Sequence, residues 1–577
     1  MSLKMPDFSK LGLYRKREFI ENSPDFSSRE ETEKLFNELL DFPVQSREGV
    51  WEFLRFKAEL FSAIDQYGSM LNIKLTCDTS DKEVEKLYRH FTTAIRPLVI
   101  AFSNQIDKKT SKLLKEYPLD KEKSEVLSRA LQTDLEIYTE KNVELFTEES
   151  LLVQKYEKLA GSQLVEFEGK KQTFQQMAKY QLRPERNIRE SAWRASAGKR
   201  FTDRQSFESL FAEMVELRSR IAENAGFENY LEYVFQDKHR FDYTPQNCKE
   251  FHEAIEKVVV PALSEIYEDR KLRLGVDTLM PWDLAVDPDG NPPLKPFENT
   301  EELLSKASSV FHQLNGRLAG IFDMMRMEGL FDLESRKNKA PGGYQSTLFD
   351  AGVPFIFANL VGVNDDLRII FHESGHAFHT FACRDQQIFE YRHAPMEFCE
   401  VASMSMELLV MPYLSLIYQS GQECRRAECI QLEKTLQILA SVAMVDAFQH
   451  RIYEERITDP DELAGIWLDL NKRFRPAPLD ISYCEQLTAR QWQRILHFFK
   501  VPLYYIEYGI AQLGALGIWQ NSLSNNEKTL SDYWKALSLG GSRPLPELFE
   551  TAGVSFDMSR QHIAPLVETV RKELWKS

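Results

Sequence analysis

Residues 367–382 read Leu-Arg-Ile-Ile-Phe-His-Glu-Ser-Gly-His-Ala-Phe-His-Thr-Phe-Ala and contain an HExxH motif at 372–376. Apolar residues lie on nearly every side of this segment, which predicts a buried helix. His372 and His376 are four residues apart, so a helix places both imidazoles on one face, where they can bind a single zinc ion. Glu373 follows His372 in sequence but points away from the face that carries the two imidazoles, and it can take a proton from a metal-bound water. The motif predicts zinc-dependent hydrolysis, most often of a peptide bond.

A catalytic zinc ion usually has three protein ligands and one water, so a third ligand is needed. His379 lies on the same helical face, but the longer HExxHxxGxxH pattern is absent because residue 382 is Ala. We therefore expect His379 to pack in the core or to support a ligand. The mostly apolar segment 394–409 carries three carboxylates, Glu397, Glu400 and Glu407. Burying a carboxylate is costly unless a cation accompanies it, and helical geometry alone does not choose among the three.

The motif together with this downstream segment resembles the thimet oligopeptidase and oligoendopeptidase F family of zinc peptidases, most closely the oligoendopeptidase F branch. The resemblance lies in His-Glu-Ser-Gly-His followed by Phe-Cys-Glu-Val-Ala-Ser at 398–403 and by Glu407. It implies that His372, His376 and Glu400 bind one Zn²⁺ and that Glu407 orients a zinc-binding histidine. The connection 383–394 is one residue shorter than in the thimet branch, which keeps Glu397 open as the alternative ligand. Cys399 is expected to be a packed core residue, not a ligand.

A β-hairpin is predicted immediately before the HExxH segment. Residues 341–349 form its first strand, 350–354 its turn and 355–360 its second strand. An extended peptide can pair with the exposed edge of such a hairpin, which would align a scissile bond without reading side chains. The alternative is an ordinary hairpin that covers the helix. The resemblance favours the substrate edge, because this family lines its cleft in that way.

Residues 497–509 read His-Phe-Phe-Lys-Val-Pro-Leu-Tyr-Tyr-Ile-Glu-Tyr-Gly. Tyr hydroxyls and a His ring can donate to the oxyanion that forms when an amide is hydrolysed. From composition alone, a Tyr-rich helix is more often core packing. The resemblance implies that a His followed by a Tyr pair contacts the substrate carbonyl, which assigns this role to His497, Tyr505 and Tyr508.

Bulk composition limits the partners and the compartment. The formal net charge of −16 over 577 residues, with no basic run interleaved with aromatics, argues against nucleic acid as a partner. No apolar run approaches the ~20 residues that span a bilayer, so no membrane partner is expected. The seven cysteines are scattered without a CxxC, and the N-terminus has no apolar secretory region, which together predict a cytoplasmic protein. The sequence leaves the oligomeric state unspecified.

Helical spacing dominates the rest of the chain, for example at 27–40, 50–67 and 81–104. A short β insertion is expected at 164–174, with Gly169 at its turn. We place a domain boundary near residue 195, which gives a helical N-terminal lobe at 1–195 and a catalytic domain at 196–577. The resemblance adds a mostly α-helical, two-lobed zincin-like (gluzincin) fold with a deep central channel and a small β-hairpin or sheet beside the HExxH helix.

The expected function is a zinc-dependent endopeptidase that hydrolyses internal bonds of short, unfolded oligopeptides through a metal-activated water. A carboxydipeptidase-like zinc peptidase is the alternative within catalysis. A non-catalytic peptide-binding module that keeps the fold is the less favoured alternative, because the core chemical residues are all present.

Overall fold

Helices make up most of the chain, as the apolar spacing predicts. The computed structural model describes residues 6–340 and 342–576. The three predicted helices correspond to α1 (Arg29–Asp41), α2 (Arg47–Cys77) and a longer segment formed by α3 (Lys82–His90), a π-helical turn at Phe91–Ile95 and α4 (Arg96–Glu116). Ser28 and Ser46 accept hydrogen bonds from the first turns of α1 and α2 and fix where these helices begin. The prediction of a mostly α-helical fold with a small sheet is confirmed.

The chain divides into two compact units that are not contiguous in sequence. The first unit contains residues 1–138, 296–424 and 514–556, and the second contains 139–295, 425–513 and 557–577. Two of the places where the chain passes from one unit to the other lie within helices, α15 (Gly421–Glu455) and α19 (Tyr505–Ser522). The division at residue 195 stays a prediction, because these units do not follow sequence order.

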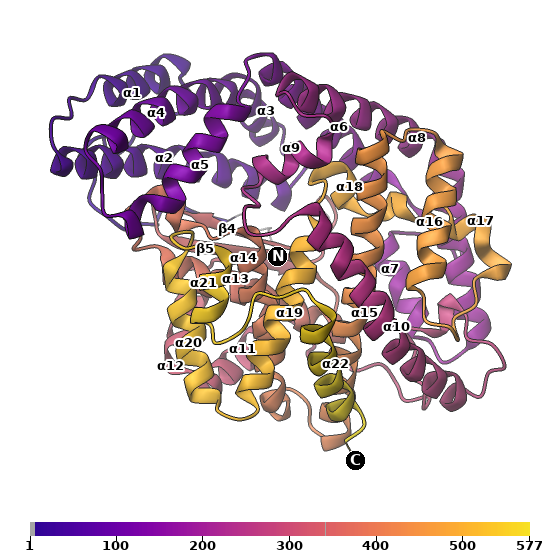
Figure 1. Cartoon of the computed structure of the whole chain (residues 1–577). Coiled ribbons are helices and arrows are strands. Elements are labelled where there is room, and N and C mark those ends of the chain that lie inside the picture. The colour runs from indigo at the N-terminus through magenta and orange to yellow at the C-terminus, as the bar shows by residue number, and fades with distance from the viewer. Residues whose placement is uncertain (1–5, 341, 577) are drawn as a thin grey trace. The chain divides into compact units, whose positions relative to one another are not determined.

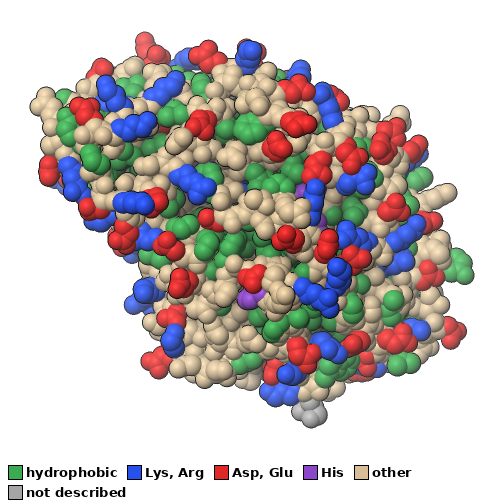
Figure 2. Space-filling view, viewed as in Figure 1, with side chains coloured by type: hydrophobic (Ala, Val, Ile, Leu, Met, Phe, Trp, Pro, Cys, Tyr) green, Lys and Arg blue, Asp and Glu red, His purple; other side chains and the backbone are tan. Residues whose placement is uncertain are grey.

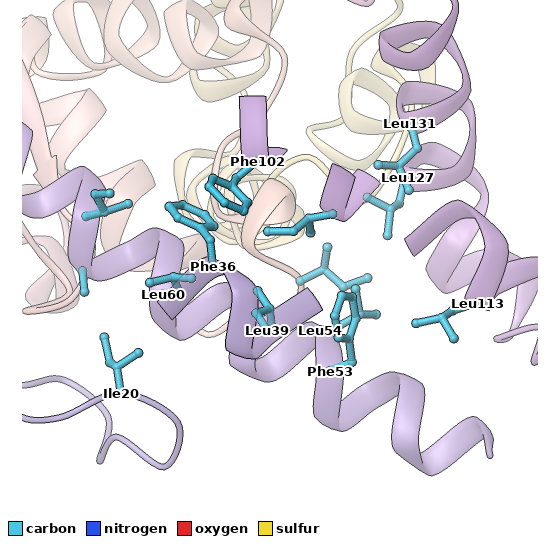
Figure 3. Packing of buried hydrophobic residues seen from close by; sticks show 14 of the residues in the cluster. Ile20, Phe36, Leu39, Phe53, Leu54, Leu60, Phe102, Leu113, Leu127 and Leu131 are labelled. Atoms are coloured by element: carbon cyan, nitrogen blue, oxygen red, sulfur yellow. The ribbon is translucent and has the colours of Figure 1, made fainter. Parts of the chain in front are cut away.

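The first unit has a helical bundle at its N-terminal end. Its remaining helices are α5 (Lys121–Ile137), α11 (Thr300–Leu314), α12 (Gly316–Met327), α13 (Asn364–Cys383), α14 (Met396–Leu409), α20 (Asn526–Leu539) and α21 (Leu545–Thr551). Phe36, Phe53 and Phe102 lie in the apolar cluster that α1, α2, α4 and α5 share (Figure 3). Phe36 stacks on Phe102 with ring centroids 5.1 Å apart, which joins α1 to α4.

A three-stranded sheet lies against α13 in the first unit (Figure 1). It comprises β3 (Phe331–Glu334), β4 (Tyr344–Leu348) and β5 (Val353–Leu360) in the order β3-β5-β4. β4 and β5 are antiparallel and form the predicted hairpin, whose turn contains Gly352 at φ 62°. Pro341, the first residue of the predicted hairpin, lies outside the described residues. β3 pairs in parallel with β5, so β4 is an edge strand.

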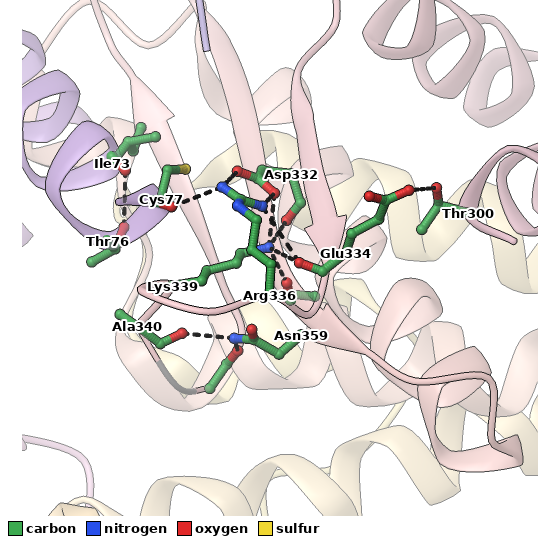
Figure 4. A network of polar contacts seen from close by, with 12 residues as sticks. Ile73, Thr76, Cys77, Thr300, Asp332, Glu334, Arg336, Lys339, Ala340 and Asn359 are labelled. Carbon is green, nitrogen blue, oxygen red and sulfur yellow. Dashed lines mark hydrogen bonds and ion pairs between the residues drawn. The ribbon is translucent and has the colours of Figure 1, made fainter. Parts of the chain in front are cut away.

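A polar network holds the loop between β3 and β4 (Figure 4). Arg336 makes a two-pronged ion pair with Asp332 at 2.5 and 2.6 Å and donates to the carbonyl of Cys77 at the end of α2. The Lys339 ammonium donates to Asp332 Oδ1 at 2.8 Å and to the carbonyl of Ala358 in β5. Because these donors reach both α2 and the sheet, they fix the path of the chain into β4.

The second unit is also helical. Its helices are α6 (Lys141–Ser162), α7 (Phe174–Ala178), α8 (Arg186–Asn224), α9 (Tyr230–Asp237), α10 (Pro245–Leu274), α16 (Pro460–Phe474), α17 (Glu485–Thr488), α18 (Leu496–Lys500) and α22 (Arg560–Leu574). The predicted β insertion is present as β1 (Val165–Phe167) and β2 (Lys170–Gln172). Glu168 and Gly169 both have positive φ in its two-residue turn, as a tight hairpin requires.

Charged side chains of both signs are interspersed over the face drawn in Figure 2. Among the described residues, no helix combines the length and the apolar character needed to cross a membrane. Residues 1–5, on which the expectation of a missing secretory segment rests in part, lie outside the described residues. The cytoplasmic location stays a prediction.

Candidate active site

The HExxH segment lies within α13, and a buried carboxylate fixes where this helix begins. Asp366 Oδ2 accepts hydrogen bonds from the backbone N–H groups of Val361, Gly362 and Val363 at 2.7, 2.6 and 3.1 Å. These N–H groups lie just before the helix, which begins at Asn364, so no hydrogen bond within the helix satisfies them. Asp366 therefore ties the end of β5 to the start of α13 and sets the rotation of the helix that carries the motif.

Gly375 lets α13 and α14 pack backbone to backbone. A Cβ added at this position would lie 2.5 Å from the carbonyl oxygen of Ala402 and 2.5 Å from the Cα of Ser403. Ordinary contacts between such atoms are roughly 3.5–4.0 Å, so only glycine permits this approach. On α14, the Ala402 carbonyl also accepts a hydrogen bond from the buried Tyr533 hydroxyl at 2.8 Å. This close crossing brings the carboxylates of α14 to the histidines of α13.

His372, His376 and Glu400 come together at the crossing. Glu400 Oε2 lies 3.4 Å from His372 Nε2 and 3.5 Å from His376 Nε2. One ligand atom from each residue can be chosen so that all lie within 4.8 Å of one another. Zinc bonds of about 2.0–2.1 Å in a tetrahedron separate neighbouring ligand atoms by about 3.3–3.4 Å. The donor types and the two distances from Glu400 are therefore compatible with one zinc ion.

Two further side chains hold these candidate ligands. Ser403 donates to Glu400 Oε2 at 2.9 Å, from one turn further along α14. His372 Nδ1 lies 2.7 Å from Glu407 Oε1, which directs its Nε2 toward Glu400. Arg368 in turn donates to Glu407 at 3.3 Å. Burial alone would lower the pKa of His372, but the hydrogen bond to Glu407 and the nearby carboxylates raise it to about 9.

Glu373 is buried on the same helix, with 7% of its surface exposed. Burial raises its pKa, although the nearby His372 and His376 oppose that shift. A carboxylate in such a position is a stronger base than one in water, which suits proton transfer near neutral pH.

The other candidates in this unit have different surroundings. His379 is buried against the ring of Phe398, and burial lowers its pKa to about 3, so it is a neutral core side chain. The group of potential ligands found in this unit contains Glu400 and not Glu397, within the described residues. Cys399 is buried and donates to the carbonyl of Ala394 at 3.5 Å. Its pKa is raised well above the ordinary value by burial, as expected for a packed thiol.

His497, Tyr505 and Tyr508 form a cluster of their own in the second unit. Tyr508 OH lies 3.4 Å from His497 Nε2, and the His497 ring packs edge-on against Tyr505 with centroids 5.0 Å apart. Tyr504 joins them, 5.0 Å from Tyr508 and 5.5 Å from His497 between ring centroids. The three predicted residues are thus neighbours.

Buried arginines hold the backbone of this cluster. Arg218 donates to the carbonyls of Phe498 and Phe499 at 2.7 and 2.6 Å, beside His497. Arg240 donates to the carbonyl of Leu503 at 2.6 Å and to Glu507 at 2.6 Å. Leu503 adopts a left-handed backbone conformation with φ 59°, which is strained for a residue other than glycine. The arginine contacts supply the support that such strain requires.

Sequence reasoning assigned no role to Ser403 or Arg368. Both stand at helical spacing from a candidate ligand, Ser403 three residues after Glu400 and Arg368 four residues before His372. That spacing is the available signal, because such residues lie one turn from the ligand on the same face. Tyr504 is four residues before Tyr508, so the sequence places both on one helical face, but nothing in the sequence distinguishes Tyr504 from a packing residue.

Comparison with known proteins gives the family. The profile of Peptidase family M3 matches residues 179–566, which is more than half of the chain and contains every residue of the two clusters. The chain belongs to Peptidase family M3. The resemblance predicted from the HExxH segment and its downstream glutamates is thereby confirmed.

A solved peptidase structure shares the whole fold of this chain, and curated oligopeptidases match part of its sequence. The solved structure of PZ peptidase A with an inhibitor is 26% identical, with a TM-score of 0.89 over 96% of this chain and 99% of that one. Oligopeptidase PepF of Bacillus subtilis (strain 168) is 25% identical over 227 residues, 39% of this chain and 33% of the relative. Oligoendopeptidase F, plasmid, of Lactococcus lactis subsp. cremoris is 21% identical over 388 residues, 64% of this chain and 61% of the relative. The matches thus span between one third and about three fifths of these two curated relatives.

Proposed function

We propose that this M3 family member is a zinc-dependent endopeptidase that cleaves internal bonds of short, unfolded oligopeptides. The observation that carries the proposal is the spacing of Glu400 Oε2 from His372 Nε2 and His376 Nε2, 3.4 and 3.5 Å, beside the buried Glu373. Family membership and the relatives named as oligopeptidases support the class of substrate.

His372, His376 and Glu400 are the residues that would hold the zinc ion. A bound Zn²⁺ would lower the pKa of a water molecule and polarise a peptide carbonyl. Glu407 keeps His372 in one tautomer and orientation through the 2.7 Å contact with Nδ1, and Arg368 anchors Glu407. Ser403 limits the rotation of the Glu400 carboxylate.

Proton transfer falls to Glu373. It takes a proton from the attacking water and passes it to the nitrogen of the leaving amine, so one carboxylate serves both halves of the reaction. The carboxyl group returns to its ionised form when the amine departs, which closes the cycle without another acid.

His497 and Tyr508, joined by Tyr505, are the proposed donors to the oxyanion of the tetrahedral intermediate. The 3.4 Å separation of Tyr508 OH and His497 Nε2 lets the two donors converge on one oxygen. The buried contacts of Arg218 and Arg240 with the backbone around them keep these donors oriented before substrate arrives.

The edge strand β4 is the proposed binding edge for the peptide. Its other edge pairs with β5 from Tyr344 to Leu348, which leaves the outward-facing backbone groups for an added strand. Backbone pairing recognises an extended chain of any sequence, which suits a peptidase of oligopeptides. A nucleic-acid partner is not proposed, given the formal net charge of −16.

The test uses an internally quenched oligopeptide that is blocked at both termini, with products mapped by mass spectrometry. We expect cleavage at internal bonds, loss of activity on chelation, and recovery on adding Zn²⁺. Glu373→Gln should lose at least about 100-fold in kcat while it keeps its bound zinc.

Three results would contradict parts of the proposal. Cleavage only of peptides with an unblocked C-terminus would favour the carboxydipeptidase alternative. Zinc-loaded protein that binds peptides and cleaves none would favour a non-catalytic module. Activity that survives Glu373→Gln unchanged would remove Glu373 from the mechanism.

A further inference from the structure

We propose that the second unit binds a second metal ion of the zinc type, through Cys248, Asp446 and His450, and that this ion fastens α10 to α15. In the described part of the chain, these three residues form the other group whose potential ligand atoms all lie within 4.8 Å of one another. None of them belongs to the site formed by His372, His376 and Glu400.

Helical spacing on two helices creates the group. Cys248 and His252 are four residues apart on α10, and Asp446 and His450 are four residues apart on α15. Each pair therefore faces one direction from its helix. His252 and His450 meet edge-on, with ring centroids 5.6 Å apart. The result is a set of facing helical residues like those that build metal sites in helical bundles.

All four side chains are removed from solvent. Cys248 and Asp446 are 0% exposed, and His252 and His450 are each 3% exposed. A carboxylate at such depth is strongly destabilising unless charge and hydrogen bonds compensate it. Its burial therefore calls for a partner, and hydrogen bonds from the histidines satisfy only part of that need.

Among the described residues, only one of the two Asp446 carboxylate oxygens has a hydrogen-bond partner. Its Oδ2 lies 2.8 Å from His252 Nε2 and 3.3 Å from His450 Nε2. Within the described residues, Asp446 Oδ1 and His450 Nδ1 have no hydrogen-bond partner. Buried polar atoms without a hydrogen-bond partner are destabilising. A cation held by these two side chains and by Cys248 would engage such lone pairs, while His252 holds the carboxylate in place.

The donor types select the class of metal. A thiolate, an imidazole and a carboxylate together suit Zn²⁺. Mg²⁺ and Ca²⁺ are disfavoured, because they bind sites made of oxygen ligands. Binding deprotonates Cys248 and releases that proton to solvent. The charges of the thiolate, the Asp446 carboxylate and a divalent ion then sum to zero, which is the balance that a buried site needs.

The position of the group indicates a structural role. α15 also carries Phe448, which packs against Phe498 with centroids 5.4 Å apart, next to His497. Gly509 in α19 meets Phe251 of α10 and Val442 of α15, where an added Cβ would lie 2.8 and 2.9 Å from their side chains. A metal that joins α10 and α15 therefore stiffens the surface on which the cluster of His497 and Tyr508 rests.

The experiment measures how many metal ions bind per chain and whether a thiolate is among their ligands. Protein stripped with chelator and titrated with Co²⁺ should take up two ions per chain and develop a near-ultraviolet thiolate-to-cobalt charge-transfer band. Cys248→Ser should lose that band and one ion. The matched control Cys399→Ser, which removes a buried thiol beside Glu400, should keep both.

A second variant separates this inference from the proposed catalytic site. His376→Ala should lose peptidase activity and one ion but keep the charge-transfer band. If the proposed catalytic site is wrong, His376→Ala still binds two ions, and the band still reports on Cys248.

The inference is overturned if wild-type protein binds Co²⁺ without a thiolate band, or if Cys248→Ser keeps the band. The four residues would then be a hydrogen-bonded polar core. If Cys248→Ser does not fold, His450→Gln supplies the second ligand variant: it should bind one ion fewer than wild type, and a variant that keeps both ions and an unchanged band would overturn the inference.

Discussion

Replacing Gly375 by alanine tests whether backbone packing between α13 and α14 builds the metal site. The new Cβ would lie 2.5 Å from both the Ala402 carbonyl oxygen and the Ser403 Cα. Relieving these contacts to roughly 3.5 Å requires the helices to separate by about 1 Å. The atoms that must move are backbone atoms of α14, so side-chain rotation cannot absorb the strain.

The separation has a calculable consequence for the ligands. Glu400 Oε2 now lies 3.4 and 3.5 Å from the two histidine nitrogens. A shift of about 1 Å takes these distances to about 4.4 Å, beyond the roughly 3.3 Å edge of a tetrahedral zinc site. We expect zinc affinity at this site to fall by at least 10–100-fold, about 1.4–2.8 kcal/mol, and overpacking to lower the free energy of unfolding by about 1–3 kcal/mol.

The assay measures the peptidase activity that metal-free protein regains across a series of buffered free Zn²⁺ concentrations, together with urea unfolding. Gly198→Ala is the matched control, since Gly198 also lies inside a helix, α8, and an added Cβ there meets nothing within 4 Å. It should unfold at the same or a higher urea concentration, gaining up to about 1 kcal/mol, with unchanged zinc dependence. The reasoning fails if Gly375→Ala regains activity at the wild-type zinc concentration and unfolds like the control.

Three further changes probe other parts of the molecule. Glu407→Gln leaves His372 Nδ1 without its charged partner, so zinc affinity should fall about 10–100-fold in the same zinc series, and an unchanged affinity would contradict the orienting role. Tyr508→Phe removes a proposed oxyanion donor beside His497 and should lower kcat by about 100-fold with little change in KM, whereas a purely raised KM would indicate substrate binding instead. Burial raises the pKa of Asp65 to about 6 from the ordinary 3.8, so the folded chain retains a proton that the unfolded chain releases, and stability falls as pH rises between these values. Asp65→Asn should therefore unfold at a higher temperature than wild type above pH 6 and at the same temperature well below pH 3.8, and equal melting temperatures throughout would contradict the raised pKa.

Local patterns in the sequence predicted the elements around the motif. The helix at 367–382, the hairpin before it and the tight turn at Gly169 depend on periodicity and turn chemistry over a few residues, and each is present. The strand β3 was not predicted, because Phe331–Glu334 is only four residues long and begins soon after α12 ends at Met327. Its pairing with β5 is a parallel, non-local contact, which a local alternation of apolar and polar residues cannot predict.

The sequence also did not predict which distant segments of the chain pack together. The two compact units are assembled from segments far apart in the chain, and the helices α15 and α19 pass through both. Hydropathy reports which face of a helix is buried but not which partner buries it, so such a division has no compositional marker. The same holds for Cys248 and Asp446, which are scattered in the sequence and meet only because α10 lies beside α15.

The choice among Glu397, Glu400 and Glu407 shows where sequence and structure complement each other. All three lie on α14 and all are buried, so burial and helical spacing rank them equally. They differ in their distance along α14 from the point where this helix crosses α13. That point is the contact of Gly375 with Ala402 and Ser403. Glu400 lies just before that contact and reaches the Nε2 side of the histidines, whereas Glu407 lies a turn beyond it and reaches His372 from the Nδ1 side. The glycine inside the HExxH motif therefore bears on the identity of the proposed third ligand, which is why its replacement is the sharpest test of the site.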